Sequence, residues 1–170
     1  MFKLTPLTAA ILVIVSAQAM ADDSLSTQNQ VGTANIAEVT QIQASFSTAT
    51  QTQLGEGNNA AAKQEGATGT ITQDQVGDFN AGYAEQLYEN GSTIVQQQVG
   101  ALNITHASQS IGALGANHAL QQQQGTGNFS FIYQEGQDGN TATTSQLGDS
   151  NEANIEQIVS GTGNNATGIQ

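Results

Sequence analysis

The sequence lacks cysteine and tryptophan and has a single proline, Pro6. Aromatic residues make up 5% of the 170 residues and charged residues 9%. Without cysteine there can be no disulfide cross-links. With so few large apolar side chains, an ordinary globular core cannot hold the fold.

Basic residues are almost absent as well, because Lys3 and Lys63 stand against 14 acidic residues and the formal net charge is −12. No basic patch exists to bind a phosphate backbone, so nucleic acid is excluded as a partner. An anionic membrane surface would repel the chain for the same reason.

What the sequence does contain is a repeat. The stretch from Gln75 to Gln86 follows the pattern Gln-x-Gly-x-x-Asn-x-small-x-x-x-Gln, and six copies begin near residues 30, 53, 75, 98, 123 and 146. The glutamines that open and close these copies, here called the key glutamines, follow one another at intervals of 11 or 12 residues, with one interval of 14 between Gln109 and Gln123. Such a spacing holds one short strand and one tight turn.

Residues 1–21 have the features of a secretory signal peptide. Lys3 gives a positive start, Leu7 to Val15 an apolar run, and Ala19-Met20-Ala21 a small-x-small cleavage site. The apolar run is too short to span a bilayer, so no transmembrane segment is expected in the mature chain. The mature protein is then a single repeat domain, residues 22–170.

From Leu25 onward the residues alternate with a period of two, which is typical of β-strands. On one face of each strand, the one that carries the repeated Gln and Asn, the side chains are small, apolar or amides. The charged residues of the strands lie on the opposite face. We therefore predict an all-β fold, a β-solenoid or cross-β stack of strand-turn-strand rungs in two facing sheets, with about six and a half rungs.

Inward amides of identical type can hydrogen-bond along the stack from rung to rung. The predicted stacking ladder consists of Gln30, Asn35, Gln41, Gln53, Asn58, Gln64, Gln75, Asn80, Gln86, Gln98, Asn103, Gln109, Gln123, Asn128, Gln134, Gln146, Asn151, Gln157, Asn164 and Gln170. Glycine recurs two places after the key glutamine, where a tight turn requires positive φ, at Gly32, Gly55, Gly66, Gly77, Gly100, Gly125, Gly136 and Gly148. The acids are expected on outward strand positions or in turns.

Neither end of the repeat array has an evident capping segment. The first rung begins close to the mature terminus, and the last copy, from Gly161 to Gln170, still follows the pattern. An uncovered sheet edge is a template for another chain, and head-to-tail contacts that do not close give filaments.

These repeats resemble those of curlin, the subunit of the curli amyloid fibres that bacteria build outside their cells. The resemblance covers residues 25–170 and implies export through the periplasm of a Gram-negative bacterium and an outer-membrane secretion pore. It also implies a nucleator subunit as partner and growth as pilus-like fibres on the cell surface, for biofilm matrix and adhesion. By the same resemblance, gatekeeper residues that slow assembly would be Asp74, Asp78, Asp138 and Asp149. The chain departs from the family in lacking the usual Gly/Asn-rich leader before the first repeat.

Three roles remain open. The chain is a fibre-forming structural subunit, the minor nucleator of the same fibre, or a monomeric β-solenoid used as an adhesin or binding module. No readable motif pairs a nucleophile with a base, and neither histidine has metal-ligand spacing, so we expect no enzyme, cofactor or metal. Three outward aromatic residues on one strand, Phe129, Phe131 and Tyr133, are candidates for lateral contacts between fibres.

Overall fold

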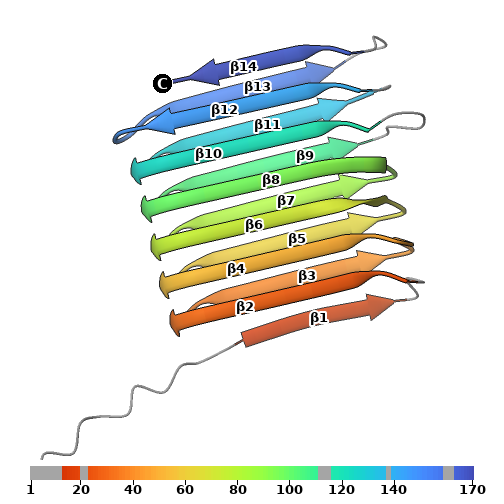
Figure 1. Cartoon of the computed structure of the whole chain (residues 1–170), viewed down its shortest axis with the longest axis horizontal. Coiled ribbons are helices and arrows are strands. Elements are labelled where there is room, and N and C mark those ends of the chain that lie inside the picture. Colours follow the sequence, from red (N-terminus) through yellow and green to blue (C-terminus); the bar gives the residue numbers. More distant parts are fainter. Residues whose placement is uncertain (1–12, 20–22, 111–115, 137–138, 159–162) are drawn as a thin grey trace, which may run out of the picture.

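The computed structural model describes residues 13–19 (backbone), 23–110, 116–136, 139–158 and 163–170. The chain winds as a β-solenoid of two parallel sheets that face each other, and successive strands alternate between the sheets (Figure 1). The predicted fold class is thereby confirmed. In the described part of the chain no helix is long and apolar enough to cross a membrane.

Each sheet has seven strands. Sheet A contains β1 (Val13–Ala19), β3 (Ile36–Ile42), β5 (Asn59–Glu65), β7 (Ala81–Leu87), β9 (Ile104–Ser110), β11 (Phe129–Glu135) and β13 (Glu152–Ile158). Sheet B contains β2 (Leu25–Thr33), β4 (Thr48–Glu56), β6 (Thr68–Asp78), β8 (Asn90–Ala101), β10 (His118–Thr126), β12 (Thr141–Leu147) and β14 (Asn165–Ile169).

Strand register follows the sequence repeat. Gln30 pairs with Gln53 between β2 and β4, and Gln41 pairs with Gln64 between β3 and β5. The same kinds of side chain therefore form columns that run along the stack. One irregularity occurs, a register shift between β6 and β8 at Thr68/Gly69, where the chain after β7 is longer by the residue Gly91.

The core between the sheets is narrow because small residues face larger ones. Sheet B contributes Ile71 and Ile94 where sheet A contributes Ala62 and Ala84, and sheet A contributes Ile132 near Ala142 of sheet B. All of these side chains are buried. Each fully buried isoleucine contributes about 1.5–3 kcal/mol, so a few large side chains stabilise a slab that is otherwise lined by alanine and amides.

Residues 13–19 fall within the predicted signal peptide, yet the structure places them as β1, parallel to β3. A strand at these residues was not predicted from the sequence. A run of Val and Ile has high β-propensity and pairs readily with an open parallel edge. Removal of residues 1–21 stays a prediction, and it would expose the edge of β3.

All eight predicted turn glycines have positive φ. At five of them, Gly32, Gly55, Gly77, Gly100 and Gly125, the close approach of the next rung is a second reason for glycine: a Cβ on Gly32 would lie 1.8 Å from the carbonyl oxygen of Gly55. At Gly148 the nearest atom is Asn151 Nδ2, at 3.6 Å. The left-handed turn residue itself follows two positions later, at Ala34 in the first copy and Phe79 in the third.

Candidate assembly interface

Glutamine side chains form two long hydrogen-bonded ladders inside the slab. In sheet B each Nε2 donates to the Oε1 of the next rung, from Gln30 to Gln53 at 2.6 Å and from Gln53 to Gln75 at 2.8 Å. The series continues through Gln98, Gln123 and Gln146 to Gln170. In sheet A the corresponding series contains Gln41, Gln64, Gln86, Gln109, Gln134 and Gln157.

The direction of these ladders is fixed by the opposite sheet. The second N–H of Gln53 Nε2 donates to the carbonyl oxygen of Ile36 at 2.8 Å, and that of Gln75 donates to Asn59 at 3.0 Å. A backbone carbonyl can only accept, so a flipped amide would place oxygen against oxygen. Every rung therefore donates toward the C-terminal end of the stack, and the two ends of the slab differ chemically.

A third glutamine ladder was not among the predicted stacking residues. Gln28 donates to Gln51 at 3.0 Å, and the series continues through Gln73 and Gln96 to Gln121. Its column then changes to Thr144 and Gly168. These glutamines precede the key glutamine by two residues, so the period-two alternation was the signal that could have revealed the ladder.

The asparagines form a ladder of the opposite sense. Asn58 donates through its backbone N and its Nδ2 to Asn35 Oδ1, at 2.9 and 3.2 Å, and its Nδ2 also reaches the Gly77 carbonyl oxygen at 2.6 Å. Asn80, Asn103 and Asn128 repeat this arrangement, and Asn151 keeps the backbone bond. Each asparagine thus ties the turns of neighbouring rungs together.

Asn164 does not belong to that asparagine column, contrary to its place in the predicted ladder. Its backbone N donates to Asn140 Oδ1, and Asn140 in turn donates to Asn117 Oδ1. This second series lies at the other edge of the slab, in the turns from sheet A to sheet B. Both edges carry an asparagine near the end of a rung, and for this reason the sequence pattern placed Asn164 in the wrong column.

The ends of the ladders are chemically complementary. At the N-terminal end Gln30 Oε1 is buried and has no hydrogen-bond partner among the residues that the structure describes. At the C-terminal end the side-chain amides of Gln157 and Gln170 donate, among the described residues, only to carbonyl oxygens of the opposite sheet, those of Thr141 and Glu152. Acceptors at one end and spare N–H donors at the other suit a second copy in the same orientation.

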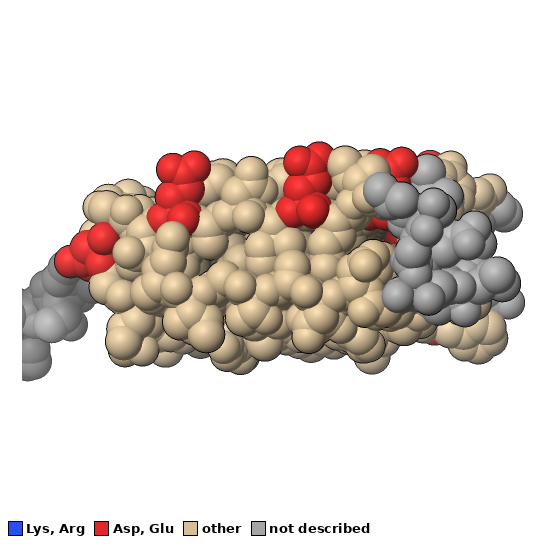
Figure 2. All heavy atoms as spheres, turned by 90° about the horizontal axis from the view of Figure 1, so that it is seen from above, with Lys and Arg blue, Asp and Glu red and all other residues tan. Residues whose placement is uncertain are grey.

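Charge is sparse at the C-terminal end of the stack. Figure 2 looks from above Figure 1, onto the side where β14 lies, and shows acidic side chains along the upper margin and at the left end, and no basic side chain. An end surface of mostly uncharged groups can pair with a backbone edge without a large desolvation cost.

The acidic turn residues Asp78 and Asp149 have a structural role that sequence reasoning missed. Asp78 Oδ1 accepts from Glu56 N at 3.0 Å, and Asp149 Oδ1 accepts from Thr126 N at 2.8 Å. Each carboxylate satisfies a backbone N–H of the preceding rung. Asp74 lies on the outer face of β6, and Asp138 lies outside the described residues.

One acid corrects the expectation that acids avoid burial. Glu89 lies in a turn, as predicted, but only 2% of it is exposed. Ser92 Oγ donates to its Oε2 at 2.6 Å, and Asn117 Nδ2 lies 3.3 Å from the same oxygen. Polar partners in the turn offset the desolvation of this carboxylate, a compensation that alternation alone does not predict.

The outer face of sheet A carries an aromatic column. Tyr83, His106 and Phe131 lie on neighbouring strands, with ring centroids 4.9 and 5.0 Å apart. Burial lowers the pKa of His106, so its ring is neutral near pH 7. Of the predicted lateral-contact residues, Phe131 belongs to this column, Phe129 is exposed beside it, and the Tyr133 hydroxyl donates to Glu135.

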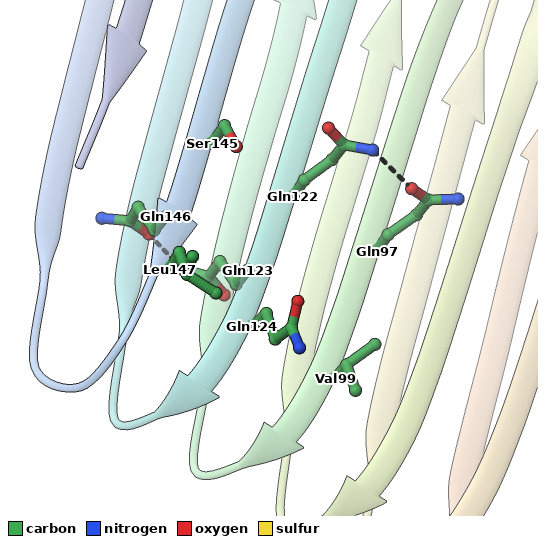
Figure 3. A pocket seen from close by; sticks show the side chains of 8 residues that line it. All are labelled: Gln97, Val99, Gln122, Gln123, Gln124, Ser145, Gln146 and Leu147. Carbon is green, nitrogen blue, oxygen red and sulfur yellow. Dashed lines mark hydrogen bonds between the residues drawn. The ribbon is translucent and has the colours of Figure 1, made fainter.

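A depression on the outer face of sheet B contains no acid or base. Gln97, Gln122 and Gln124 line it with Val99 and Leu147, and Gln122 Nε2 donates to Gln97 Oε1 at 2.8 Å (Figure 3). Among the described residues no group of three metal-binding side chains occurs. The arrangement offers surface contacts, and the reactive groups of a catalytic site are not assembled there.

Searches against protein-family models, curated proteins and solved structures find no match.

Proposed function

We propose that this chain is the repeating subunit of an extracellular cross-β fibre, to which copies add end to end in one orientation. The observation that carries the proposal is the one-way glutamine ladder, which leaves a buried, unpartnered acceptor at Gln30 and spare donors at Gln157 and Gln170. A second copy in the same orientation brings its acceptor end to the donor end of the first, whereas a reversed copy places like groups together.

The likeness of the repeats to curlin supports export through the periplasm and growth as cell-surface fibres in a biofilm matrix. It also supports a nucleator subunit and an outer-membrane pore as partners. The minor nucleator role is the second candidate within the same fibre. It is less favoured because the repeats remain regular up to Gln170, with amides in register at both ends.

A monomeric binding module is the candidate from a different class. Solenoids that stay monomeric need polar end repeats that satisfy their edges. Here the last described strand is short and exposed, and Gln30 Oε1 has no partner in the described part of the chain. These features favour association over a solitary slab.

The decisive experiment follows thioflavin T fluorescence after residues 22–170 are diluted from denaturant at neutral pH, with and without preformed seeds. A lag that seeds abolish, together with fibre reflections near about 4.7 and 10 Å, is the expected result. A stable monomer with β circular dichroism and no seeded growth would exclude the fibre subunit and favour the binding module.

A further inference from the structure

The two ends of the slab carry unequal half rungs. Among the described strands, sheet B ends with β14 and sheet A ends one strand earlier, with β13. Sheet A begins with β1, which precedes the first complete rung, β2 and β3 (Figure 1). Once residues 1–21 are removed, as the signal peptide prediction requires, sheet A has one strand fewer than sheet B. The C-terminal half rung then has no counterpart in the next copy.

Direct addition of a second copy to β14 would interrupt sheet A. Its β2 would pair with β14, and its β3, held to β2 by a short turn, would lie two strand spacings away from β13. Such a separation of about 9.6 Å, twice the spacing of paired strands, leaves both backbone edges unpaired. Gln157 would also have no glutamine above it, and Gln28 of the second copy would meet Gly168, which has no side chain to donate.

Docking of β2 directly on β12 removes every one of these mismatches. If β2 of the second copy pairs with β12 in the register of the other strands of sheet B, its Gln30 lies above Gln146 and its Gln28 lies above the hydroxyl of Thr144. In sheet A, β3 of the second copy pairs with β13, so Gln41 lies above Gln157 and Asn35 above Asn151. Val39 then packs on Ile155, which borders the core without complete burial.

β14 holds this position weakly. It pairs with β12 over five residues, Thr141 to Ser145, whereas β2 pairs with β4 over nine. Ile169 is 77% exposed, and only the small residues Ala166 and Gly168 point into the slab on the paired part of the strand. A longer strand with two inward glutamines gains more hydrogen bonds at the same edge.

We propose that β14 is an exchangeable end strand, and that the edge of β12 is the docking site for β2 of a second copy, which displaces β14 during fibre growth. The inference rests on the proposed fibre function. At a free C-terminal end, β14 therefore pairs with the edge of β12. Each added copy replaces β14 with a complete rung, its own β2 and β3.

Cysteine cross-links distinguish exchange from direct addition, because the chain has no cysteine of its own. Thr27, Thr143 and Thr167 belong to one outward column. Exchange places Thr27 of one copy beside Thr143 of another, whereas direct addition places it beside Thr167. Adjacent parallel strands lie about 4.8 Å apart, within the Cα range of disulfides.

The variants are Thr27→Cys with Thr143→Cys, and Thr27→Cys with Thr167→Cys, each exported as the full chain and recovered after processing at Asp22. Fibres grown under reducing conditions are oxidised and run on non-reducing gels. We expect covalent oligomers from the first pair and at least tenfold fewer from the second. Cross-linking of the second pair, or of neither, in well-formed fibres would overturn strand exchange.

A lock on β14 gives an independent measurement. Thr143→Cys with Thr167→Cys joins β14 to β12, and the matched control, Thr50→Cys with Thr72→Cys, joins β4 to β6 in the same column. Oxidation of the monomer should slow seeded growth at least tenfold in the first variant and leave the control unchanged. Equal growth would overturn the exchange, while absence of fibres from all reduced variants would contradict the fibre function itself.

Discussion

A Cβ placed on Gly55 would lie 2.0 Å from the carbonyl oxygen of Gly77 in the next rung. The Gly55 backbone also has φ of 129°, a conformation that side chains rarely adopt. The neighbouring atom is a backbone oxygen inside a hydrogen-bonded stack and cannot rotate away. Glycine at this position therefore sets how closely two rungs approach at the turn.

Gly55→Ala should accordingly destabilise the fold by at least about 2 kcal/mol, since backbone strain and overpacking act together. Urea denaturation of the monomer, followed by circular dichroism, measures the change. Gly168→Ala is the control, because nothing lies within 4 Å of its Cβ position and its φ is not positive. Similar midpoints for the two variants would contradict the steric explanation.

Gln75→Glu should break two hydrogen bonds, to Gln98 Oε1 and to the Asn59 carbonyl oxygen, and place a carboxylate in the buried ladder. We expect a loss of about 3 kcal/mol or more at neutral pH. Burial favours the neutral carboxyl, so the loss should shrink as pH falls toward about 4.

Gln124→Glu provides the matched control for that substitution. Gln124 is exposed on the outer face of β10, between Val99 and Leu147 (Figure 3). The new charge stays in water there, and the effect on stability should remain within about 0.5 kcal/mol. If Gln124→Glu lowered the stability as much as Gln75→Glu does, the added charge, and not the loss of the ladder, would be the cause of the destabilisation.

His106 gives the fold a specific pH dependence. Burial against Tyr83 and Phe131 lowers its pKa in the folded state, so the unfolded chain binds the proton more readily. Stability should therefore fall as pH decreases below about 6.5, the ordinary pKa of histidine, until the folded-state pKa is reached. His106→Phe keeps a ring in the column and should reduce this slope when thermal unfolding is compared at about pH 5 and 8. An unchanged slope would assign the effect to other groups.

Outer-face aromatics should affect how fibres associate side by side. Replacing Phe129, Phe131 and Tyr133 by Thr removes apolar rings from the surface and leaves the inward ladder intact. We expect normal seeded growth and less bundling in electron micrographs. The control replaces Val95 and Leu120, outward on sheet B, by Thr, and undiminished bundling in the aromatic variant would contradict a lateral role for sheet A.

Strict periodicity made the fold predictable from the sequence. Key glutamines at near-constant spacing set the register, and alternation assigned residues such as Ile71 and Gln75 to the inside. Other features depend on contacts between rungs and sheets, which no single copy encodes. The Ile36 carbonyl that orients Gln53 lies on the opposite sheet, and the polar partners of Glu89 come from two neighbouring rungs, Ser92 on β8 and Asn117 directly before β10.

The strand formed by residues 13–19 escaped prediction for a different reason. The same apolar residues satisfy the pattern of a signal peptide and that of an edge strand, because both require a short apolar run. Position at the start of the chain favoured the first interpretation. The structure pairs this run with β3, in parallel and in register from Val13 to Ala19.

Variation in repeat length is confined to one edge of the slab. From the key glutamine to the asparagine the distance is always five residues, as from Gln30 to Asn35 and from Gln146 to Asn151. The longer spacing between Gln109 and Gln123 falls in the turn from β9 to β10, on the opposite edge. Foreign peptides inserted at that permissive edge should be displayed at regular intervals along a fibre, whereas insertions at the edge that carries Asn35 and Asn151 should abolish rung stacking.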